Sequence, residues 1–503
     1  MARLHTMRKK GSLNLPGITH ETKSLTEKLL LQDAEKHHCY FRPAGLHNHL
    51  SHQVLAAYDM GAAPGLIQRI YDKVASYQRP IFVEEKDAKI VVTKDNWTQH
   101  LGDPEAYGAY FKFFSQEVEK LGVSSALETY VFRPEANYEG KWMLNRFVTG
   151  ALHPLIQTGY GAEFGNDILI ATGLAQTAIH KAGTADIFPY SEMWADNASP
   201  PPPNEGAGRQ PTYGPSLLEI VRQVCDSPVL APPLPYDPNV LLSERLKKSV
   251  EGPKAAEIMR ICKQYMHSIP NDASDEELSA RVEELIWTGS LVLFATGREG
   301  RETRLDFFLM HLVTSSLFFE PLLGALEDTR SKVALIRQYI PIMVTLILSR
   351  GRPVIRPSLV REWSTTPRPS GWQAALGIRS HKGSGIGDMA KDEDYNPWPA
   401  LIQGAAHHPD LHLAKTMRTL VLAERKYGII PPGGVIGAFR PAKKGVDQPE
   451  ETFPGMAKID GTLFVKAAGV MMDYMGWSVC GEPAKEDWDR SALGWDDAWV
   501  NRN

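Results

Sequence analysis

The sequence predicts an all-α protein, built as one large, bundle-like helical domain with long loops rich in proline and glycine. Apolar residues recur at intervals of three and four along most of the chain, the spacing that gives a helix one buried face. The alternating pattern typical of a half-buried strand does not extend over any useful length. Prolines and glycines gather instead in a few long stretches, where they prevent regular structure.

The first 200 residues combine an irregular start with a run of helices. Residues 1–20 include a short basic cluster but no apolar period, so we expect a disordered or loosely packed arm. A loop is expected at 41–45, and a short extended segment within 81–92. The expected helices cover residues 22–37, 49–60, 64–77, 104–121, 124–132, 143–160 and 167–181.

Residues 197–215, NASPPPPNEGAGRQPTYGP, are the clearest linker or surface loop. They permit a division into two halves, although we expect residues 21–503 to form a single large domain. Two further loops rich in glycine and proline are expected at 350–389 and 431–455. The expected helices of this part cover residues 217–224, 240–249, 253–267, 276–295, 302–326, 329–349, 398–405 and 463–475, with another beginning at Pro409.

Charge and composition exclude several classes of partner. The net charge is −4, which gives no electrostatic reason to expect nucleic acid or an anionic membrane. The longest apolar stretches, 291–296 and 339–348, are shorter than the ~20 residues that span a bilayer and are interpreted as buried helices. Four dispersed cysteines without a CxxC pair fit a reducing compartment, so a cytoplasmic protein is expected.

No nucleotide-binding loop is recognisable. The segment 382–388, KGSGIGD, has a GxGxG spacing, but no apolar strand precedes it. GxxxxGK[ST] is absent from the sequence. A dinucleotide cofactor therefore has no expected binding motif here.

The segment 404–420, GAAHHPDLHLAKTMRTL, carries the strongest sign of chemistry. A helix that begins at Pro409 places His412 and Lys415 three residues apart, on the same side. His408 lies near that side at the helix entry. Two imidazoles and an amine on one face suggest a metal or catalytic site, and a solvated polar face is the plain alternative.

Other histidines lie inside strongly apolar helical segments, among the sixteen in the chain: His49, His52, His153, His180 and His311. A single buried histidine usually bonds a backbone carbonyl or a hydroxyl. Several on separate helices favour a metal site of converging side chains. A site of imidazoles without thiolates favours iron or another transition metal in a catalytic role. Carboxylates are scarce nearby, with Glu163 and Asp306 the closest in sequence.

Four segments resemble motifs of the questin oxidase-like family of fungal polyketide biosynthesis: LHNHLSHQVLAAYDMGA, GALHPLIQTGYGAEFG, DFFLMHLVTSSLFF and HPDLHLAKTMRTL. They span residues 46 to about 420, and the later segment LFVKAAGVMMDYMGW is also similar. The resemblance implies oxidative opening of, or oxygen insertion into, an aromatic polyketide quinone such as an anthraquinone. The expected partner is therefore a small aromatic polyketide substrate.

The resemblance also implies a metal centre, because the family includes a non-haem iron dioxygenase with four histidines and a carboxylated lysine as ligands. Matched motif by motif, the ligands fall on His49, His153, His311, His412 and Lys415. A lysine desolvated in an apolar site is readily neutral and so can react with CO2 to form a carbamate. That carbamate on Lys415 would supply the missing anionic ligand. A lysine that extends to water is the alternative.

The hypothesis is an Fe(2+) oxygenase with O2 as co-substrate, in which one octahedral position stays open. Asn48, His52, Glu163 and His408 are candidate catalytic residues that orient ligand imidazoles or carry protons. One rival is a metal-free Baeyer–Villiger monooxygenase that uses NADPH, as members of the family have been described. The other is a non-enzymatic helical binding protein whose buried histidines are structural.

Overall fold

The computed structural model describes residues 5–42, 45–183, 187–188, 190–194, 203–204, 208–233, 235–371, 386–441 and 449–500. Parts of the loops expected at 197–215, 350–389 and 431–455 lie outside these residues. The described residues are predominantly helical, which confirms the all-α class. Their only sheet is an antiparallel pair, β1 (Tyr40–Arg42) and β2 (Leu46–His47).

The α-helices follow the expected order. The first group is α1 (His20–Lys36), α2 (Leu50–Asp59), α3 (Pro64–Ala75), α4 (Tyr107–Leu121), α5 (Val123–Leu127), α6 (Met143–Val148), α7 (His153–Phe164), α8 (Asp167–Ile179) and α9 (Tyr190–Met193). The second group is α10 (Leu217–Asp226), α11 (Leu242–Val250), α12 (Lys254–Met266), α13 (Asp275–Phe294), α14 (Met310–Ser316), α15 (Phe319–Leu323), α16 (Thr329–Ser349), α17 (Ser358–Arg361), α19 (Trp398–His407), α20 (Leu413–Tyr427) and α21 (Leu463–Met475).

Short 3-10 and π segments join these helices. They are η1 (Asp87–Lys89), η2 (Pro104–Ala106), the π-helical η3 (Glu128–Phe132), η4 (Pro134–Ala136), η5 (Gly150–Leu152), η7 (Pro228–Leu230), η8 (Asp392–Asp394), η9 (Met456–Lys458), η10 (Ser478–Cys480) and η11 (Asp496–Trp499). The region expected to hold an extended segment, 81–92, contains η1 and no strand. The strands flank the loop expected at 41–45 instead.

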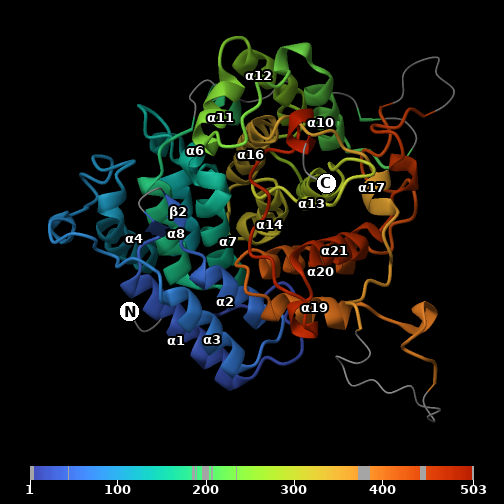
Figure 1. Cartoon of the computed structure of the whole chain (residues 1–503). Helices are drawn as coiled ribbons and strands as arrows, with labels where there is room; N and C mark the ends of the chain where they lie inside the picture. Colours follow the sequence, from blue (N-terminus) through green and yellow to red (C-terminus); the bar gives the residue numbers. More distant parts are fainter. Residues whose placement is uncertain are drawn as a thin grey trace.

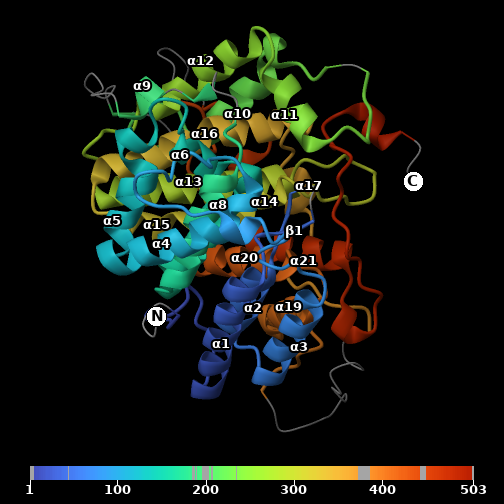
Figure 2. The ribbon, with the colours of Figure 1, turned by 90° about the vertical axis from the view of Figure 1, so that its left-hand side faces the viewer.

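The helices surround a central pair, α13 and α14 (Figure 1). On one side α7 and α8 pack along each other, and α4 covers α8. On another side α20 packs against α14, α2 and α21. Figure 2 shows α1, α2 and α3 at one end of the molecule and α10, α11 and α12 at the other. Segments that are hundreds of residues apart thus meet around α14.

Helix α16 explains the longest apolar stretch. Among the described residues it is the one helix long and apolar enough to cross a membrane, and 89% of its apolar window is buried in the fold. It packs against α6, α11 and α12, so its apolar side chains belong to the protein core. This confirms the interpretation of residues 339–348 as part of a buried helix.

Residues 5–19 do not form the loose arm expected from the sequence. Met7 and Leu13 are buried, and the segment lies against the helical body. The backbone N–H of Ser12 donates to Glu163 Oε1 (2.6 Å), and that of Leu13 donates to Asp59 Oδ2 (3.1 Å). Buried carboxylates need hydrogen-bond donors, and the backbone of this segment provides some of the donors for Asp59 and Glu163.

Three of the expected helices differ from the structure near a histidine of interest. The helix expected over 143–160 is interrupted before His153, between α6 and α7. The one over 302–326 begins only at Met310, next to His311, and is further divided into α14 and α15. The helix expected to begin at Pro409 begins at Leu413. In each case a local turn is stabilised by tertiary contacts that helical spacing does not reveal.

A buried ion cluster connects α20 to α2 and α7. Arg418 Nε donates to Asp59 Oδ2 (2.9 Å), and Arg418 Nη2 donates to Glu163 Oε1. All three side chains are excluded from solvent. Removal of the cation would leave two carboxylates buried close together without their partner.

Arg418→Met is therefore expected to lower the free energy of unfolding by about 3–5 kcal/mol, the usual cost of breaking a buried ion pair. Urea denaturation at neutral pH measures this. Arg69→Met, at an exposed position of α3, is the matched control and should change stability by less than about 0.5 kcal/mol. Equal effects of the two substitutions would contradict a structural role for the cluster.

Candidate metal centre

Four histidines and one lysine come together in the interior, and all lie in the first turn of a helix. His49 is the N-cap of α2 and His412 the N-cap of α20. His153 is the first residue of α7, and His311 is the second residue of α14. Lys415 follows His412 by three residues on α20. All five side chains are buried.

Each turn that precedes these helices is built locally. Asp410 Oδ1 accepts hydrogen bonds from the N–H groups of His412 (2.9 Å) and Leu413 (2.8 Å), which starts α20 after Pro409. Asp306 Oδ1 accepts from the N–H of Phe308 (2.8 Å) ahead of α14. The capping carboxylates explain why both helices begin later than the apolar spacing predicts.

The break before α7 depends on a left-handed turn. Gly150, Ala151 and Leu152 have φ values of 58°, 52° and 68°. A Cβ at Gly150 would lie 2.3 Å from His180 Nε2, so a side chain does not fit there. The carbonyl of Gly150 accepts a hydrogen bond from His153 Nδ1 (2.7 Å). The turn therefore both ends α6 and orients the His153 ring.

The imidazoles lie close to one another. His49, His311 and His412 offer ring nitrogens that are all within 4.8 Å of one another. His49 Nε2 and His153 Nε2 are 2.9 Å apart. Two nitrogens at right angles around one ion, each about 2.1 Å from it, have nearly this separation. The arrangement thus fits a single shared ion.

Hydrogen bonds fix which nitrogen of two rings carries a proton. A carbonyl oxygen only accepts, so His153 Nδ1 donates to Gly150 and His311 Nδ1 donates to the carbonyl of Phe307 (2.9 Å). The Nε2 atoms of both rings therefore carry the lone pairs. Ligand histidines in metal sites are oriented in this way.

Several donor atoms at the site have no hydrogen-bond partner in the described part of the chain. They are His49 Nδ1, His311 Nε2, both ring nitrogens of His412 and Lys415 Nζ. A buried polar atom without a hydrogen bond costs free energy and calls for a ligand or another explanation. Their concentration on residues whose rings lie together fits a metal ion with nitrogen ligands.

Burial also favours the neutral form of the donors. Burial is the main cause that lowers the pKa of His49, His153 and His311 well below the ordinary value, with Lys415 or neighbouring histidines adding to the shift. Burial likewise lowers the pKa of His412 to about 4, and that of Lys415 to about 7. Neutral imidazoles and a neutral amine are the forms that bind metals or CO2.

The four candidate catalytic residues have different surroundings. His52 lies beside the cluster, with its ring centroid 5.7 Å from that of His49 and its Nε2 donating to Gln157 Oε1 (2.7 Å). Its Nδ1 has no partner among the described residues. Asn48 Oδ1 accepts from the N–H of Leu50 (2.8 Å) and so shapes the turn that holds His49.

Glu163 and His408 have structural partners. Glu163 belongs to the ion cluster with Arg418. His408 Nε2 donates to the carbonyl of Met475 (3.1 Å), and its Nδ1 accepts from the N–H of Asp410 (3.1 Å). With both nitrogens engaged, His408 positions the turn before α20. Its location therefore supports a positioning role for His408.

Sequence reasoning missed His47 and gave no role to His180. The His47 ring stacks on His153 with centroids 3.8 Å apart, and its Nε2 is 2.8 Å from His180 Nε2. Because His180 Nδ1 donates to the carbonyl of Gln176 (2.5 Å), its Nε2 accepts the bond from His47. The spacing of histidines at 47, 49 and 52 was the available signal for His47.

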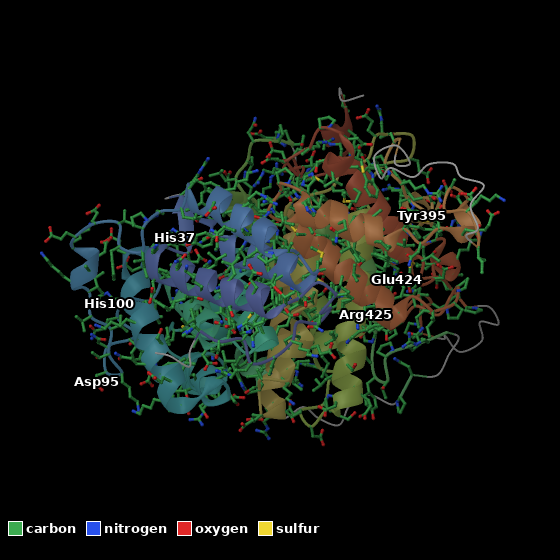
Figure 3. The ribbon with its side chains drawn as sticks, turned by 90° about the horizontal axis from the view of Figure 1, so that it is seen from below. His37, Asp95, His100, Tyr395, Glu424 and Arg425 are labelled. Carbon is green, nitrogen blue, oxygen red and sulfur yellow. The ribbon has the colours of Figure 1, made fainter. Side chains whose placement is uncertain are left out.

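Helix α20 leads from the cluster to the surface. His412 and Lys415 lie at its buried start, and Glu424 and Arg425 lie near its other end (Figure 3). His37 and His100 are also labelled in Figure 3. His37 lies at the end of α1, and His100 lies in the loop before α4. His37 Nδ1 lies 2.9 Å from Asp33 Oδ1 of α1.

Comparison with known proteins decides the family, because a questin oxidase-like family matches residues 46–420, most of the chain. The chain belongs to the questin oxidase-like family. It is 26% identical to a questin oxidase of Aspergillus fumigatus, over 94% of this chain and 92% of that protein. It is also 26% identical to a Baeyer–Villiger monooxygenase of Aspergillus aculeatus, over 96% and 91% of the two chains.

A further relative is a Baeyer–Villiger oxidase of Paecilomyces divaricatus. It is 28% identical, over 82% of this chain and 80% of that protein. The matched region includes all four histidines and Lys415. The resemblance seen in the sequence is thereby confirmed, whereas the ligand roles of these residues remain a prediction.

Lys415→Met is expected to change how the stability of the metal-free protein depends on pH. The unfolded lysine binds a proton up to about pH 10.4, but the folded one loses it near pH 7. The unfolded state thus binds more protons between these values, so stability should rise by about 1.4 kcal/mol per pH unit. The uncharged methionine should remove that part of the slope.

Urea denaturation at pH 7, 8 and 9 provides the measurement, with both proteins stripped of metal. Other titrating groups contribute equally to the two proteins and cancel in the difference. Identical slopes would show that Lys415 keeps its proton in the folded protein.

Proposed function

We propose that this protein is a non-haem iron, O2-dependent oxygenase that cleaves a ring of an aromatic polyketide quinone or hydroquinone. The observation that carries the proposal is the convergence of buried nitrogen donors without hydrogen-bond partners from α2, α14 and α20, with His153 of α7 beside them. The family and the printed names of its relatives, a questin oxidase and Baeyer–Villiger oxidases, support oxidative chemistry on such a substrate.

His49, His153, His311, His412 and carboxylated Lys415 would hold the iron. Iron(II) supplies the one-electron chemistry by which ground-state dioxygen reacts with an organic substrate. Imidazoles suit iron, and the absence of thiolates at the described site fits a catalytic rather than a structural ion. The buried helix starts exclude bulk water from the reacting groups.

The charge balance favours a carbamate on Lys415. The carboxylate nearest to a ligand ring is Asp410, whose Oδ2 is 3.7 Å from His412 Nδ1. Its Oδ1 already accepts from two backbone N–H groups and from Trp488 Nε1 (3.0 Å). The neutral Lys415 amine can bond the carbon of CO2 and release one proton, which gives an anionic oxygen ligand.

His52 is the candidate proton carrier. Its Nε2 is committed to Gln157, so its Nδ1 lone pair is free to take a proton from substrate or water. Asn48 and His408 hold the backbone turns of His49 and His412. Glu163 acts more remotely, because it fixes α7 to α20 through Arg418.

Reconstitution tests the function. Metal-stripped protein is loaded anaerobically with Fe(2+), and consumption of O2 and formation of ring-opened product are measured with a hydroxyanthraquinone and its reduced form. Activity should follow iron content and need O2. Mass spectrometry with 18O2 should show label in the product.

One rival has support from the relatives' names: a Baeyer–Villiger monooxygenase that uses NADPH without iron. The same assay separates the two functions. Turnover by metal-free protein that depends on NADPH would favour the rival and contradict the iron proposal.

Lys415→Ala is expected to lose most of its iron and at least about 100-fold of its activity, because the anionic ligand is missing. Iron is measured by elemental analysis, and 13C NMR after exposure to 13CO2 should show a carbamate signal in the wild type alone. Lys426→Ala, near the exposed end of the same helix, is the control and should retain iron, signal and activity. Retained iron and activity in Lys415→Ala would exclude the lysine's role.

His311→Ala separates a metal centre from a structural histidine. If His311 is a metal ligand, its replacement should lower the iron content as well as the stability. If His311 is purely structural, as in a non-enzymatic binding protein, its replacement should lower the stability while the iron content stays unchanged.

A further inference from the structure

A pocket lies beside the cluster, between the C-terminal segment and the loop ahead of α14. Its volume is about 610 Å³, which suits a ligand of a few fused rings. The C-terminal segment follows the outside of the helices and pairs with the residues before α14: the N–H of Phe307 donates to the carbonyl of Asp489 (2.8 Å) (Figure 2). Three aromatic side chains contribute to the lining, Tyr474, Trp488 and Trp499.

Arg490 and Phe307 lie between this pocket and the histidines. The Phe307 ring centroid is 5.1 Å from that of His311 and 4.9 Å from that of His412. On its pocket side, the guanidinium carbon of Arg490 is 3.6 Å from the Phe307 centroid. Trp488, also in the wall, donates to Asp410, the residue that caps the helix of His412.

The basic side chains of the lining differ in their availability. Arg304 is engaged by Asp489 (2.6 Å) and by Ser491 Oγ (2.8 Å). Lys485 lies over the Tyr474 ring, 3.8 Å from its centroid. Arg490 is exposed to the pocket, and within the described ranges no carboxylate lies within 4.0 Å of its guanidinium nitrogens. Its donors are therefore free for a ligand.

Building on the proposed function, we propose that this pocket binds the substrate as an aromatic anion whose phenolate or carboxylate oxygen pairs with Arg490. A guanidinium bonds such an oxygen strongly and directionally. The ligand's rings then lie against aromatic side chains of the lining such as Trp488. Arg490 and, behind it, Phe307 separate the bound rings from the histidines.

The geometry favours an anion for a second reason. The Arg490 guanidinium packs on the Phe307 ring, which in turn contacts His311 and His412, so a positive charge lies near these histidines. A bound anion would offset that charge. A neutral polycycle would gain the aromatic contacts but not the ion pair.

Binding of two matched probes tests the assignment without turnover. Anthraquinone-2-carboxylate is the anion and 2-(hydroxymethyl)anthraquinone its neutral counterpart, and quenching of tryptophan fluorescence reports binding. Arg490→Met should weaken binding of the anion about tenfold or more and change binding of the neutral probe less than threefold. Arg490→Lys, which keeps the charge, should weaken binding of the anion less.

Arg69→Met is the matched control, since Arg69 is an exposed arginine on α3, outside the pocket. It should leave both affinities within about twofold. Equal weakening of the two probes in Arg490→Met, or no weakening, would overturn the assignment. Circular dichroism confirms that each variant is folded.

The same samples separate this inference from the proposed function. Binding is measured with metal-free and with iron-loaded protein, and iron is quantified in each. Anion binding that depends on Arg490 in a protein that takes up no iron would support the pocket and reject the metal centre. Normal iron uptake by the protein, without selective loss of anion binding in Arg490→Met, would support the metal centre and reject the assignment of the pocket.

Discussion

The interior of this protein is organised by the need to bury imidazole and amine donors away from water. Four helix starts meet at one place, and each contributes a nitrogen donor from its first turn. The amino end of a helix carries partial positive charge, which disfavours an imidazolium there. Together with burial this keeps the rings neutral, and it favours an anion as the final ligand. A metal held by neutral imidazoles and one carbamate fits both the neutral rings and the preference for an anionic ligand.

The surrounding residues hold those donors in position. The carbonyls of Gly150 and Phe307 fix the tautomers of two rings, and Asp410 fixes the turn of a third. One turn beyond Lys415 on α20, Arg418 binds α20 to α2 and α7 through its two carboxylates. Three of the four helices that carry the proposed ligands are thus joined to one another by an interaction that lies outside that set of residues. Fixed ligands are what an oxygenase needs to keep one coordination position open.

The sequence predicted the fold class and most helices, because the apolar spacing of a helix can be recognised from the order of the residues alone. It also placed His49, His153, His311, His412 and Lys415, but through motif resemblance rather than through spacing. Their convergence depends on turns that the spacing missed: the left-handed turn at Gly150 and the capped turns at Asp306 and Asp410. Besides these local contacts, the turns have partners distant in sequence, such as Arg350 for Asp306 and Trp488 for Asp410. His47 was missed for the same reason, since its partners His153 and His180 are more than a hundred residues away.

An anomalous difference map at the iron edge is the most direct measurement of the central claim. Crystals grown anaerobically with Fe(2+) and CO2 should show one strong peak at bonding distance from nitrogens of His49, His153, His311 and His412. Density should extend from Lys415 Nζ to the same peak, as a carbamate requires. A map without a peak at these rings, or with iron bound elsewhere, would contradict the account.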